Sequence, residues 1–461
     1  MQAFKPFFLV VTALLITGCA VGPSYQRPTA PDAIFFKEAG DWVTAAPADA
    51  LERGPWWQLF NDPVLSDLAA RVEVSNQNVA AAVAAYAQAR ALVAEQRAGL
   101  FPAVNLGGGA SRANSNGTIR NSFQANLGAS WEPDVWGRLQ NIANGGAALA
   151  AASAADLATA KLAAQGELTV NYLSLRQQDA QKALLATTLV GYTRALDIAQ
   201  NRYTAGVAAK TDVLQAQTQL ANAKADEAGL QRTRAQLEHA IAVLVGQAPS
   251  NFSLPFAGQW KPSVPDVPVG VPSTLLQRRP DIAAAERRML NANAQIGVAK
   301  SAYYPSLSLN ASVGTSASRV ADLLSAPAAV WALGLSAAQV LFKGGALDAR
   351  VDGATAAYDQ TVARYRQVVL TAFQNVEDQL SATRVLKVQQ DLRAQASSSA
   401  DQVEQQALNR YRSGLVNYTE VISAQTTALA ARRALVQATA DRQTTAVALI
   451  QSLGGGWANT P

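Results

Sequence analysis

The sequence predicts a mixed α and β fold in which one unit of roughly 200 residues occurs twice. First, residues 201–217 and 409–425 align without a gap, and eight of the seventeen aligned positions are identical. Second, each copy contains paired stretches in which apolar and polar residues alternate, which is the period of a β-strand. Third, a proline-free run of some 68 residues follows each pair, and such runs are typical of long helices rather than of a globular core.

The repeat divides the 461-residue chain into five segments. They are a signal segment (1–18), an N-terminal tether with the segment after it (19–66), a first repeat (67–248), a proline-rich connection (249–277) and a second repeat (278–457). Each repeat is expected to run through a helix, a β-hairpin, a long helix, a tip and a returning helix. The expected hairpins span 102–132 and 305–341, the long helices 138–205 and 346–413, and the returning helices 211–245 and 419–453.

Composition excludes several classes of protein. Charged residues make up 15% of the chain, and there is one Cys and one His, which argues against a metal cluster or a disulfide framework. The net charge of +5 is spread along the chain without a basic run, so nucleic acid is not an expected partner. His239 has no Asp, Cys or second His at a catalytic spacing, and Glu132 and Asp134 flank Pro133 in an expected turn. We therefore expect no enzyme.

The N-terminus predicts export. Lys5 precedes an apolar run, 7–16, that is too short to span a bilayer and that leads to small residues and Cys19. The only cysteine of the chain stands directly after Gly18, which is typical of a bacterial lipoprotein signal with Cys19 lipidated. An ordinary signal peptide with an incidental cysteine is the alternative. The prolines that follow predict a stiff, extended tether.

The segment from Pro55 to Pro63 carries Trp56, Trp57 and Phe60, which we interpret as packing residues. From Asp67 to about Ala98 the chain is rich in Ala and Gln without proline, which predicts one helix. Pro102 ends this helix.

Two β-hairpins are expected to have one apolar face each. In the first hairpin, strict alternation places Phe123, Ala125, Leu127, Ala129 and Trp131 on one side. In the second hairpin, the residues on that side are Leu307, Leu309, Ala311, Val313, Trp331, Leu333 and Leu335. The turn of the first hairpin is expected at 114–117, where Asn, Ser and Gly cluster.

The strands favour a membrane barrel, although half-buried strands of soluble proteins alternate in the same way. Each strand is about ten residues long, enough to cross an outer membrane at a tilt. Four strands cannot close a transmembrane barrel, since the smallest have about eight. Other copies of the chain must complete it: two copies would give a narrow, filled barrel, and three a twelve-stranded barrel wide enough to conduct.

The long helices are expected to pack as coiled-coil-like columns. In the second run, apolar residues follow steps of three and four: Val351, Ala354, Tyr358, Val362, Tyr365, Val369, Ala372, Val376 and Leu380. The repeated segment marks the turn to each returning helix. Gly206 and Gly414 suit C-terminal caps, and Thr211 and Thr419, each followed by an acidic residue, suit helix starts.

Several motifs in the expected order make the chain similar to the TolC-like outer-membrane factor family, in particular to its lipoprotein branch. They are Cys19–Tyr25, Trp56–Asp62, Trp131–Arg138, Arg278–Glu286, Ala294–Lys300, Tyr304–Leu307 and Leu453–Trp457. The resemblance covers nearly the whole mature chain. It implies a homotrimer, with a twelve-stranded outer-membrane barrel continued by a twelve-helix α-barrel across the periplasm. It also implies a periplasmic adaptor and an inner-membrane pump of the resistance-nodulation-division type as partners, an efflux function, and no cofactor besides the covalent lipid.

The resemblance further implies that the two tips meet the adaptor and that the tunnel narrows there. The expected adaptor contacts are Arg202, Gly206, Val207, Lys210, Arg410, Gly414, Leu415 and Asn417. The candidate periplasmic gate comprises Asp212, Tyr418, Thr419, Glu420, Ser423 and Thr426. Some relatives carry an Asp and an Arg where this chain has Ser423 and Thr426, so a charged ring is not expected, and Glu420 is the nearest acidic candidate. The charges of Arg202, Arg410, Asp212 and Glu420 also suit the helix dipoles without any further role.

Two other functions stay open at this stage. A duct for protein secretion would share this architecture. A lipidated coiled-coil protein without a channel would explain the anchor and the helices, but it would not explain two amphipathic hairpins.

Overall fold

The computed structural model describes residues 21–29, 36–39, 55–115, 117–265, 267, 279–323, 325 and 329–455. Cys19 and the signal segment lie outside these residues, so lipidation stays a prediction. The chain forms two compact units, and each takes parts of both repeats. The sheet unit combines Ala84–Ala155 and Ile282–Val368 with the described N-terminal residues, and the helical unit combines Pro31–Val83, Asp156–Asp281 and Val369–Pro461.

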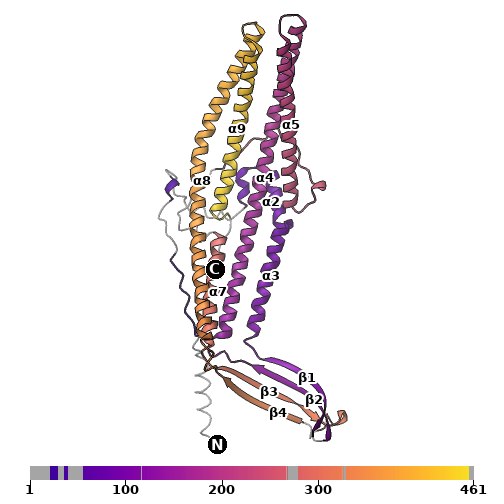
Figure 1. The fold of residues 1–461 in the computed structure, drawn as a ribbon, viewed down its shortest axis with the longest axis vertical. Helices are drawn as coiled ribbons and strands as arrows, with labels where there is room; N and C mark the ends of the chain where they lie inside the picture. Colours follow the sequence, from indigo (N-terminus) through magenta and orange to yellow (C-terminus); the bar gives the residue numbers. More distant parts are fainter. Residues whose placement is uncertain are drawn as a thin grey trace. The chain divides into compact units, whose positions relative to one another are not determined.

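The sheet unit contains one four-stranded antiparallel sheet in the order β1-β2-β3-β4 (Figure 1). Its strands are β1 (Ala103–Ser115), β2 (Thr118–Trp131), β3 (Ser306–Ala317) and β4 (Ala329–Ala338). Both expected hairpins are therefore confirmed. The hairpins also pair with each other through β2 and β3, with Leu127 opposite Val313. This pairing is why the compact units do not follow the sequence repeats.

The register places apolar side chains on one face of the whole sheet. Leu106 pairs with Leu127, Leu127 with Val313 and Val313 with Trp331. Paired residues project to the same side, so an apolar row crosses all four strands. Leu106 is 82% exposed and Trp331 80% exposed, which shows that the described residues of the chain leave this face uncovered. The opposite face carries small and polar residues, among them Asn105, Gly107, Gln124, Asn126, Ser308, Asn310, Ser312, Gly314 and Ser336.

Long helices lead into and out of the sheet. α3 (Gln77–Ala98) and α7 (Pro280–Ser301) precede the hairpins, and α4 (Arg138–Thr204) and α8 (Ala346–Arg412) follow them with 67 residues each. The returning helices are α5 (Lys210–Leu244) and α9 (Tyr418–Ser452). In Figure 1, α4 lies beside α5 and α8 beside α9 as antiparallel helical hairpins. The expected seam of α8 is buried from Tyr365 to Leu380.

The prediction of one helix from Asp67 to Ala98 is wrong, because α2 (Pro63–Ser75) and α3 are separate helices. Asn76 between them has an extended backbone, with φ −68° and ψ 124°. Its side-chain oxygen accepts hydrogen bonds from the backbone N–H groups of Asn78 and Val79 at 3.0 and 3.1 Å. Asn76 therefore caps α3, and side-chain capping of this kind favours a new helix start over continuation.

The core of the helical unit forms around the aromatic segment before α2. Trp56, Trp57 and Phe60 lie in the short helix η2 (Trp56–Phe60) and are 3%, 7% and 4% exposed, so their packing role is confirmed. The described residues also form the short helices η1 (Lys37–Ala39), η3 (Pro249–Asn251) and η4 (Val320–Asp322). The proline-rich connection also joins the core, since Leu254 and Val267 are buried. The prolines exclude regular structure and predict a connection on the protein surface, so the burial of these two residues corrects that prediction.

Asp62 ties three distant segments of the helical unit together. One carboxylate oxygen accepts the N–H groups of Val64 and Leu65 at 2.9 and 3.2 Å and so caps α2. The other oxygen accepts the Tyr172 hydroxyl of α4 at 2.7 Å and the indole N–H of Trp260 at 3.0 Å. The Asp62 carboxylate thus accepts four hydrogen bonds. These bonds hold together the segments from which the helices lead to the tips.

Candidate functional site

The two turns between the long and the returning helices have the same backbone structure. The N–H of Val207 donates to the carbonyl of Arg202 at 2.9 Å, and the N–H of Leu415 donates to the carbonyl of Arg410 at 2.9 Å. Each donor directly follows a glycine, Gly206 in the first turn and Gly414 in the second. These glycines have φ +73° and +74°, a left-handed conformation that favours glycine. Both turns are therefore Schellman caps, which confirms the predicted role of the two glycines.

The starts of the returning helices differ from the sequence prediction. α5 begins at Lys210 and α9 at Tyr418, so Thr211 and Thr419 are second residues of their helices and not caps. The side chain of Asn417 caps α9 by accepting the N–H of Glu420 at 3.1 Å. Ala209 precedes α5 and has no side chain that can do the same. The second tip is accordingly the better capped of the two.

Arg202 and Arg410 occupy equivalent positions but make different contacts. Arg410 pairs with Glu420 of its own tip at 2.9 Å, and both side chains are about half exposed, at 55% and 46%. Arg202 instead crosses to the other tip, where its guanidinium donates to the carbonyl of Tyr411 at 2.8 Å. The same guanidinium lies 4.7 Å from the centroid of the Tyr411 ring. Arg202 therefore links the two helical hairpins, whereas Arg410 stabilises one of them.

A buried cluster, which we call the tip cluster, lies beneath these contacts. It contains Ala195 and Ala199 of α4, Val213 and Ala216 of α5, Tyr411 of α8, and Tyr418 and Val421 of α9. The rings of Tyr411 and Tyr418 are 5.3 Å apart between centroids and tilted by 54°. Burial raises the pKa of the Tyr418 hydroxyl to about 12, and the neighbouring Tyr411 adds to the effect. All four helices thus meet in one apolar contact just below the tips.

The expected adaptor contacts present an apolar pair to solvent. Val207 is 64% exposed and Leu415 71% exposed, and each is the residue directly after a cap glycine. Gly206, Lys210, Gly414 and Asn417 are exposed as well. Exposed apolar side chains at a turn are candidates for contact with another protein.

The candidate gate residues fall into two groups. Thr419, Glu420, Ser423 and Thr426 are exposed along α9, and Asp212 is partly buried at the start of α5. Tyr418 is only 1% exposed and lies inside the tip cluster. Its position is that of a packing residue in the single chain. Arg410, Glu420 and Ser423 also line one end of a groove of about 270 Å³ between α8 and α9.

Several of these contacts could not be predicted from the sequence. Tyr203 and Tyr411 are equivalent in the repeat, yet Tyr203 is 41% exposed and Tyr411 only 4% exposed. A polar link also joins the returning helices, since the amide of Gln219 donates to the side chain of Gln425 at 3.3 Å. Only the identity of Gln217 and Gln425 in the repeat pointed to this region. Contacts between the hairpins depend on packing that a repeat pattern does not encode.

Other parts of the described chain offer no catalytic arrangement. Glu132 forms a two-point ion pair with Arg138, and the carboxylate of Asp134 accepts the N–H groups of Leu139 and Gln140 at the start of α4. His239 is exposed on α5. Among the described residues, no group of three His, Cys, Asp or Glu side chains could hold a metal ion.

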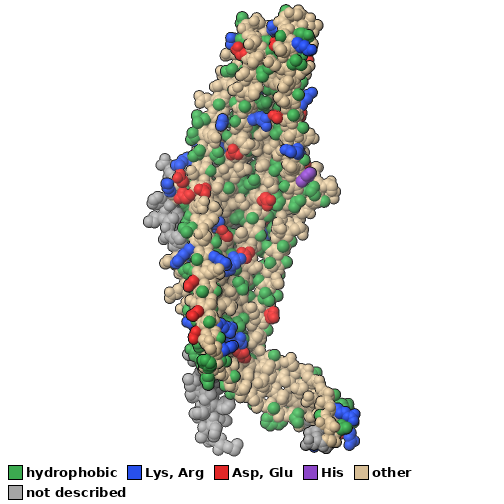
Figure 2. Space-filling view, in the orientation of Figure 1, with side chains coloured by type: hydrophobic (Ala, Val, Ile, Leu, Met, Phe, Trp, Pro, Cys, Tyr) green, Lys and Arg blue, Asp and Glu red, His purple; other side chains and the backbone are tan. Residues whose placement is uncertain are grey.

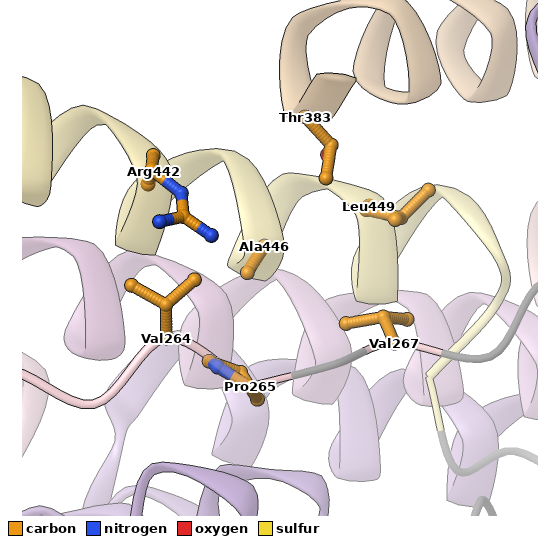
Figure 3. Close-up of a pocket in the computed structure, with 7 residues that line it drawn as sticks. All are labelled: Val264, Pro265, Val267, Thr383, Arg442, Ala446 and Leu449. Atoms are coloured by element: carbon orange, nitrogen blue, oxygen red, sulfur yellow. The ribbon is translucent and has the colours of Figure 1, made fainter. Parts of the chain in front are cut away.

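Figure 3 shows a small cavity of about 50 Å³ between the proline-rich connection, α8 and α9. Its lining is mostly apolar, with Val264, Pro265 and Leu449 among the residues that face it. Arg442 is the charged residue of the lining, and its guanidinium donates to the side chain of Gln390. The hydroxyl of Thr383 also lines the cavity, but the lining contains no Asp, Glu or His that could activate it.

Comparison with known proteins identifies the family. A family model described as outer membrane efflux protein matches residues 68–247 and 271–455. The chain belongs to the outer membrane efflux protein family. The two matched ranges agree with the two sequence repeats, and members of the family are channels and not enzymes.

Named members of the family align over nearly the whole chain. The probable efflux pump outer membrane protein TtgC of Pseudomonas putida is 32% identical, with 97% of this chain and 95% of TtgC aligned. The outer membrane protein OprJ of Pseudomonas aeruginosa is 30% identical, with 98% and 97% aligned. The pyoverdine export outer membrane protein OpmQ of the same species is also 30% identical, with 99% and 98% aligned.

Solved structures of outer-membrane channels share the fold. The outer-membrane channel OprN superposes with a TM-score of 0.86 at 29% identity and covers 95% of this chain and 100% of its own. The open state of the MtrE outer membrane channel of Neisseria gonorrhoeae gives a TM-score of 0.86 at 27% identity, with 95% and 98% covered. This family member is therefore an outer-membrane protein with a TolC-like mixed α and β fold.

Proposed function

We propose that this chain is the outer-membrane channel of a tripartite efflux system, through which substrates pass from an inner-membrane pump and a periplasmic adaptor to the cell exterior. The observation that supports this proposal most strongly is the difference between the two faces of the sheet. Its apolar face is uncovered, and its opposite face is small and polar. An apolar outer face and a polar inner face are what a water-filled barrel in lipid requires.

The sheet also supports assembly of three copies into a homotrimer. β1 and β4 each pair with one neighbour within the chain, and an unpaired strand edge inside a bilayer is costly because lipid offers no hydrogen bonds. Two copies would give eight strands, a barrel that side chains must fill. The glycines and serines of the polar face are too small to fill it. Twelve strands from three copies suit this face better.

The long helices would continue the barrel as a tunnel of twelve helices. Each helix of 67 residues extends on the order of 100 Å at 1.5 Å per residue. The tips would then lie at the periplasmic end, where Val207 and Leu415 present apolar surface to an adaptor. We assign the pump to the resistance-nodulation-division type by resemblance.

A polar constriction near the tips would close the resting channel. We place it at Thr419, Glu420, Ser423 and Thr426, which are exposed along α9. Asp212 belongs to the same region. Tyr418 would act from within the tip cluster, by holding α9 in position.

A lipid on Cys19 would fix the protein to the same membrane. The tether that follows is held against the sheet unit, since the N–H of Val21 donates to the carbonyl of Trp136 at 3.0 Å. The amide of Asn293 donates to the carbonyl of Pro23 at 3.0 Å. The Trp136 ring stacks on Tyr304 at 4.7 Å, and aromatic side chains of this kind are typical of membrane interfaces. These contacts suit an anchor at the level of the inner leaflet.

The decisive experiment is reconstitution of the purified protein in planar bilayers. We expect discrete conductance steps from an oligomer that resists SDS at room temperature and dissociates on heating. A structural coiled-coil lipoprotein would give no conductance. Copurification with a periplasmic adaptor and a pump would separate efflux from protein secretion, whereas copurification with a protein-secretion machinery would contradict the proposal.

A further inference from the structure

The charged residues of the sheet lie at one end of it. In residues 103–131 and 306–338 they are three arginines and one aspartate: Arg112, Arg120, Arg319 and Asp322. All four stand near the β1–β2 turn or in the β3–β4 connection. Figure 2 shows Lys and Arg side chains gathered at this end of the sheet. The end that carries the connections is therefore basic, while the rest of the strands is uncharged.

The register places Arg112 on the apolar face. Arg112 pairs with Asn121, and it follows Val104, Leu106, Gly108 and Ala110 along one side of β1. The eight residue-to-residue steps from Val104 to Arg112 span about 27 Å along the strand, or roughly 20 Å of depth at the usual tilt of a barrel strand. Arg112 thus lies at the far margin of an apolar band, where a long cationic side chain can reach headgroups.

Arg319 lies next to the same end of β2. The last paired residue of β3 is Ala317, opposite Phe123, so Arg319 follows two residues beyond that pair. Its side chain is 82% exposed, and the nearest carboxylate oxygen, from Asp322, is 3.9 Å away, too far for a hydrogen bond. Arg319 therefore keeps most of its donors available to a ligand.

We propose that Arg112 and Arg319 bind the phosphate groups of an acylated glycolipid in the outer leaflet of the membrane that the sheet crosses. The inference rests on the proposed function, because it needs the sheet to span the outer membrane. Guanidinium groups bind phosphate oxygens through two parallel hydrogen bonds. Leu106 and Ile119 are 82% and 55% exposed and lie on the same face, where acyl chains can cover them.

Arg120 provides a matched control on the opposite face. It pairs with Ala113, so it lies on the side of Asn105 and Gly107 and would point toward the lumen. It has the same charge and stands at the same end of the sheet. A soluble anion in the lumen would depend on Arg120, and a lipid on Arg112 and Arg319.

The test measures binding of diphosphoryl lipid A to the delipidated oligomer by native mass spectrometry. Arg112→Ala and Arg319→Ala are each expected to weaken binding about fivefold, the factor for one cation near an anionic membrane surface. Arg112→Lys should fall between Arg112→Ala and wild type, and Arg120→Ala should bind as wild type does. Lipid A without phosphates should bind equally weakly to the wild type and to the double variant Arg112→Ala/Arg319→Ala. Inorganic phosphate at 5 mM should not compete with diphosphoryl lipid A for the wild type.

The inference is overturned if the Arg112→Ala and Arg319→Ala variants retain diphosphoryl lipid A as the wild type does. It is also overturned if Arg120→Ala loses binding and inorganic phosphate competes, which would indicate a soluble anion in the lumen. Each variant is first checked for its oligomer mass and conductance. A wild-type protein that conducts but binds lipid A regardless of Arg112 contradicts this inference alone, whereas one that forms no conducting oligomer contradicts the proposed function as well.

Discussion

Arg202 of one helical hairpin donates a hydrogen bond of 2.8 Å to the backbone carbonyl of Tyr411 in the other and lies 4.7 Å from the centre of its ring. Its counterpart in the repeat, Arg410, pairs with Glu420 in its own hairpin. One link between the hairpins thus comes from a single arginine of an otherwise duplicated pair. The two sequence repeats have therefore diverged in the contact that joins their helical hairpins.

Arg202→Ala is expected to loosen both tips, and Arg410→Ala is the matched control. The first change removes a charged hydrogen bond and a cation–π contact in a partly buried place, worth about 2 kcal/mol together. The second removes an exposed ion pair, worth at most about 1 kcal/mol. Hydrogen exchange of the amides in 199–216 and 407–424 checks this. Equal protection in the two variants would contradict the role of Arg202.

Glu420→Ala is expected to raise single-channel conductance, because it removes an exposed carboxylate from the proposed constriction. Asp226→Ala on α5 provides a control, since Asp226 also forms an exposed ion pair, with Arg433 at 2.8 Å. Unchanged conductance in the Glu420 variant would count against the constriction. Tyr418→Ala acts differently, because loss of a buried aromatic side chain costs about 3–5 kcal/mol and disturbs the whole tip cluster.

Alkaline pH is expected to destabilise the tip cluster through Tyr418. Burial raises the pKa of Tyr418 to about 12, whereas an unfolded tyrosine has a pKa of about 10. The cluster is fully stabilised below pH 10, and stability falls as pH rises toward 12, because the unfolded state then loses its proton first. The folded and unfolded pKa values of Tyr418 differ by about 2. At about 1.4 kcal/mol for a pKa difference of one, the total loss of folding stability is about 2–3 kcal/mol.

Tyr418→Phe should remove this part of the alkaline destabilisation. The measurement is the thermal unfolding midpoint, by circular dichroism, at pH 8 and pH 11. Tyr203→Phe, at an exposed position of the other tip, should leave the difference between the two pH values as in the wild type. A Tyr418→Phe variant with the full wild-type pH dependence would contradict the account.

Asp62→Asn is expected to lower the free energy of unfolding by about 2–3 kcal/mol, because an amide cannot accept hydrogen bonds from all four donors and leaves buried groups unpaired. Asp67→Asn is the control. Asp67 pairs with Arg71 on the surface of α2, and its side chain is 59% exposed, so the expected loss is below about 0.5 kcal/mol. Denaturant titration measures the free energy of unfolding of both variants. Equal losses of this free energy would refute the role of Asp62.

Gly314→Ala is expected to disrupt the junction of the two hairpins. A Cβ at Gly314 would lie 2.4 Å from the carbonyl oxygen of Ala125 and 2.8 Å from Cα of Asn126, both backbone atoms. Gly334→Ala is the control, because its Cβ would meet nothing within 4 Å. We expect the oligomer to lose its resistance to SDS in the first variant only. A resistant Gly314→Ala oligomer would show that the β2–β3 register is not as described.

The sequence predicted the elements of this fold better than the contacts between them. Alternation identified β2, β3 and β4, the turn residues at 114–117 placed β1 as the partner of β2, and the repeated glycines identified both caps, because these signals are local. The break at Asn76 was missed since an Ala-rich run masks one capping residue. The different roles of Arg202 and Arg410 were missed for another reason. Their local sequences are the same, and only packing between hairpins makes one cross over.

The proposed barrel is tested most directly by cysteine pairs that place one cysteine in β1 and one in β4. Within one chain β2 and β3 separate these strands by about 14 Å, at 4.7–4.9 Å per strand, which is too far for a disulfide. Cys19, the only native cysteine, is removed in the same variant. Oxidation should therefore link neighbouring copies, and the account predicts a ladder that ends at three chains. Chains that stay unlinked for every pair tested along the two strands would contradict it.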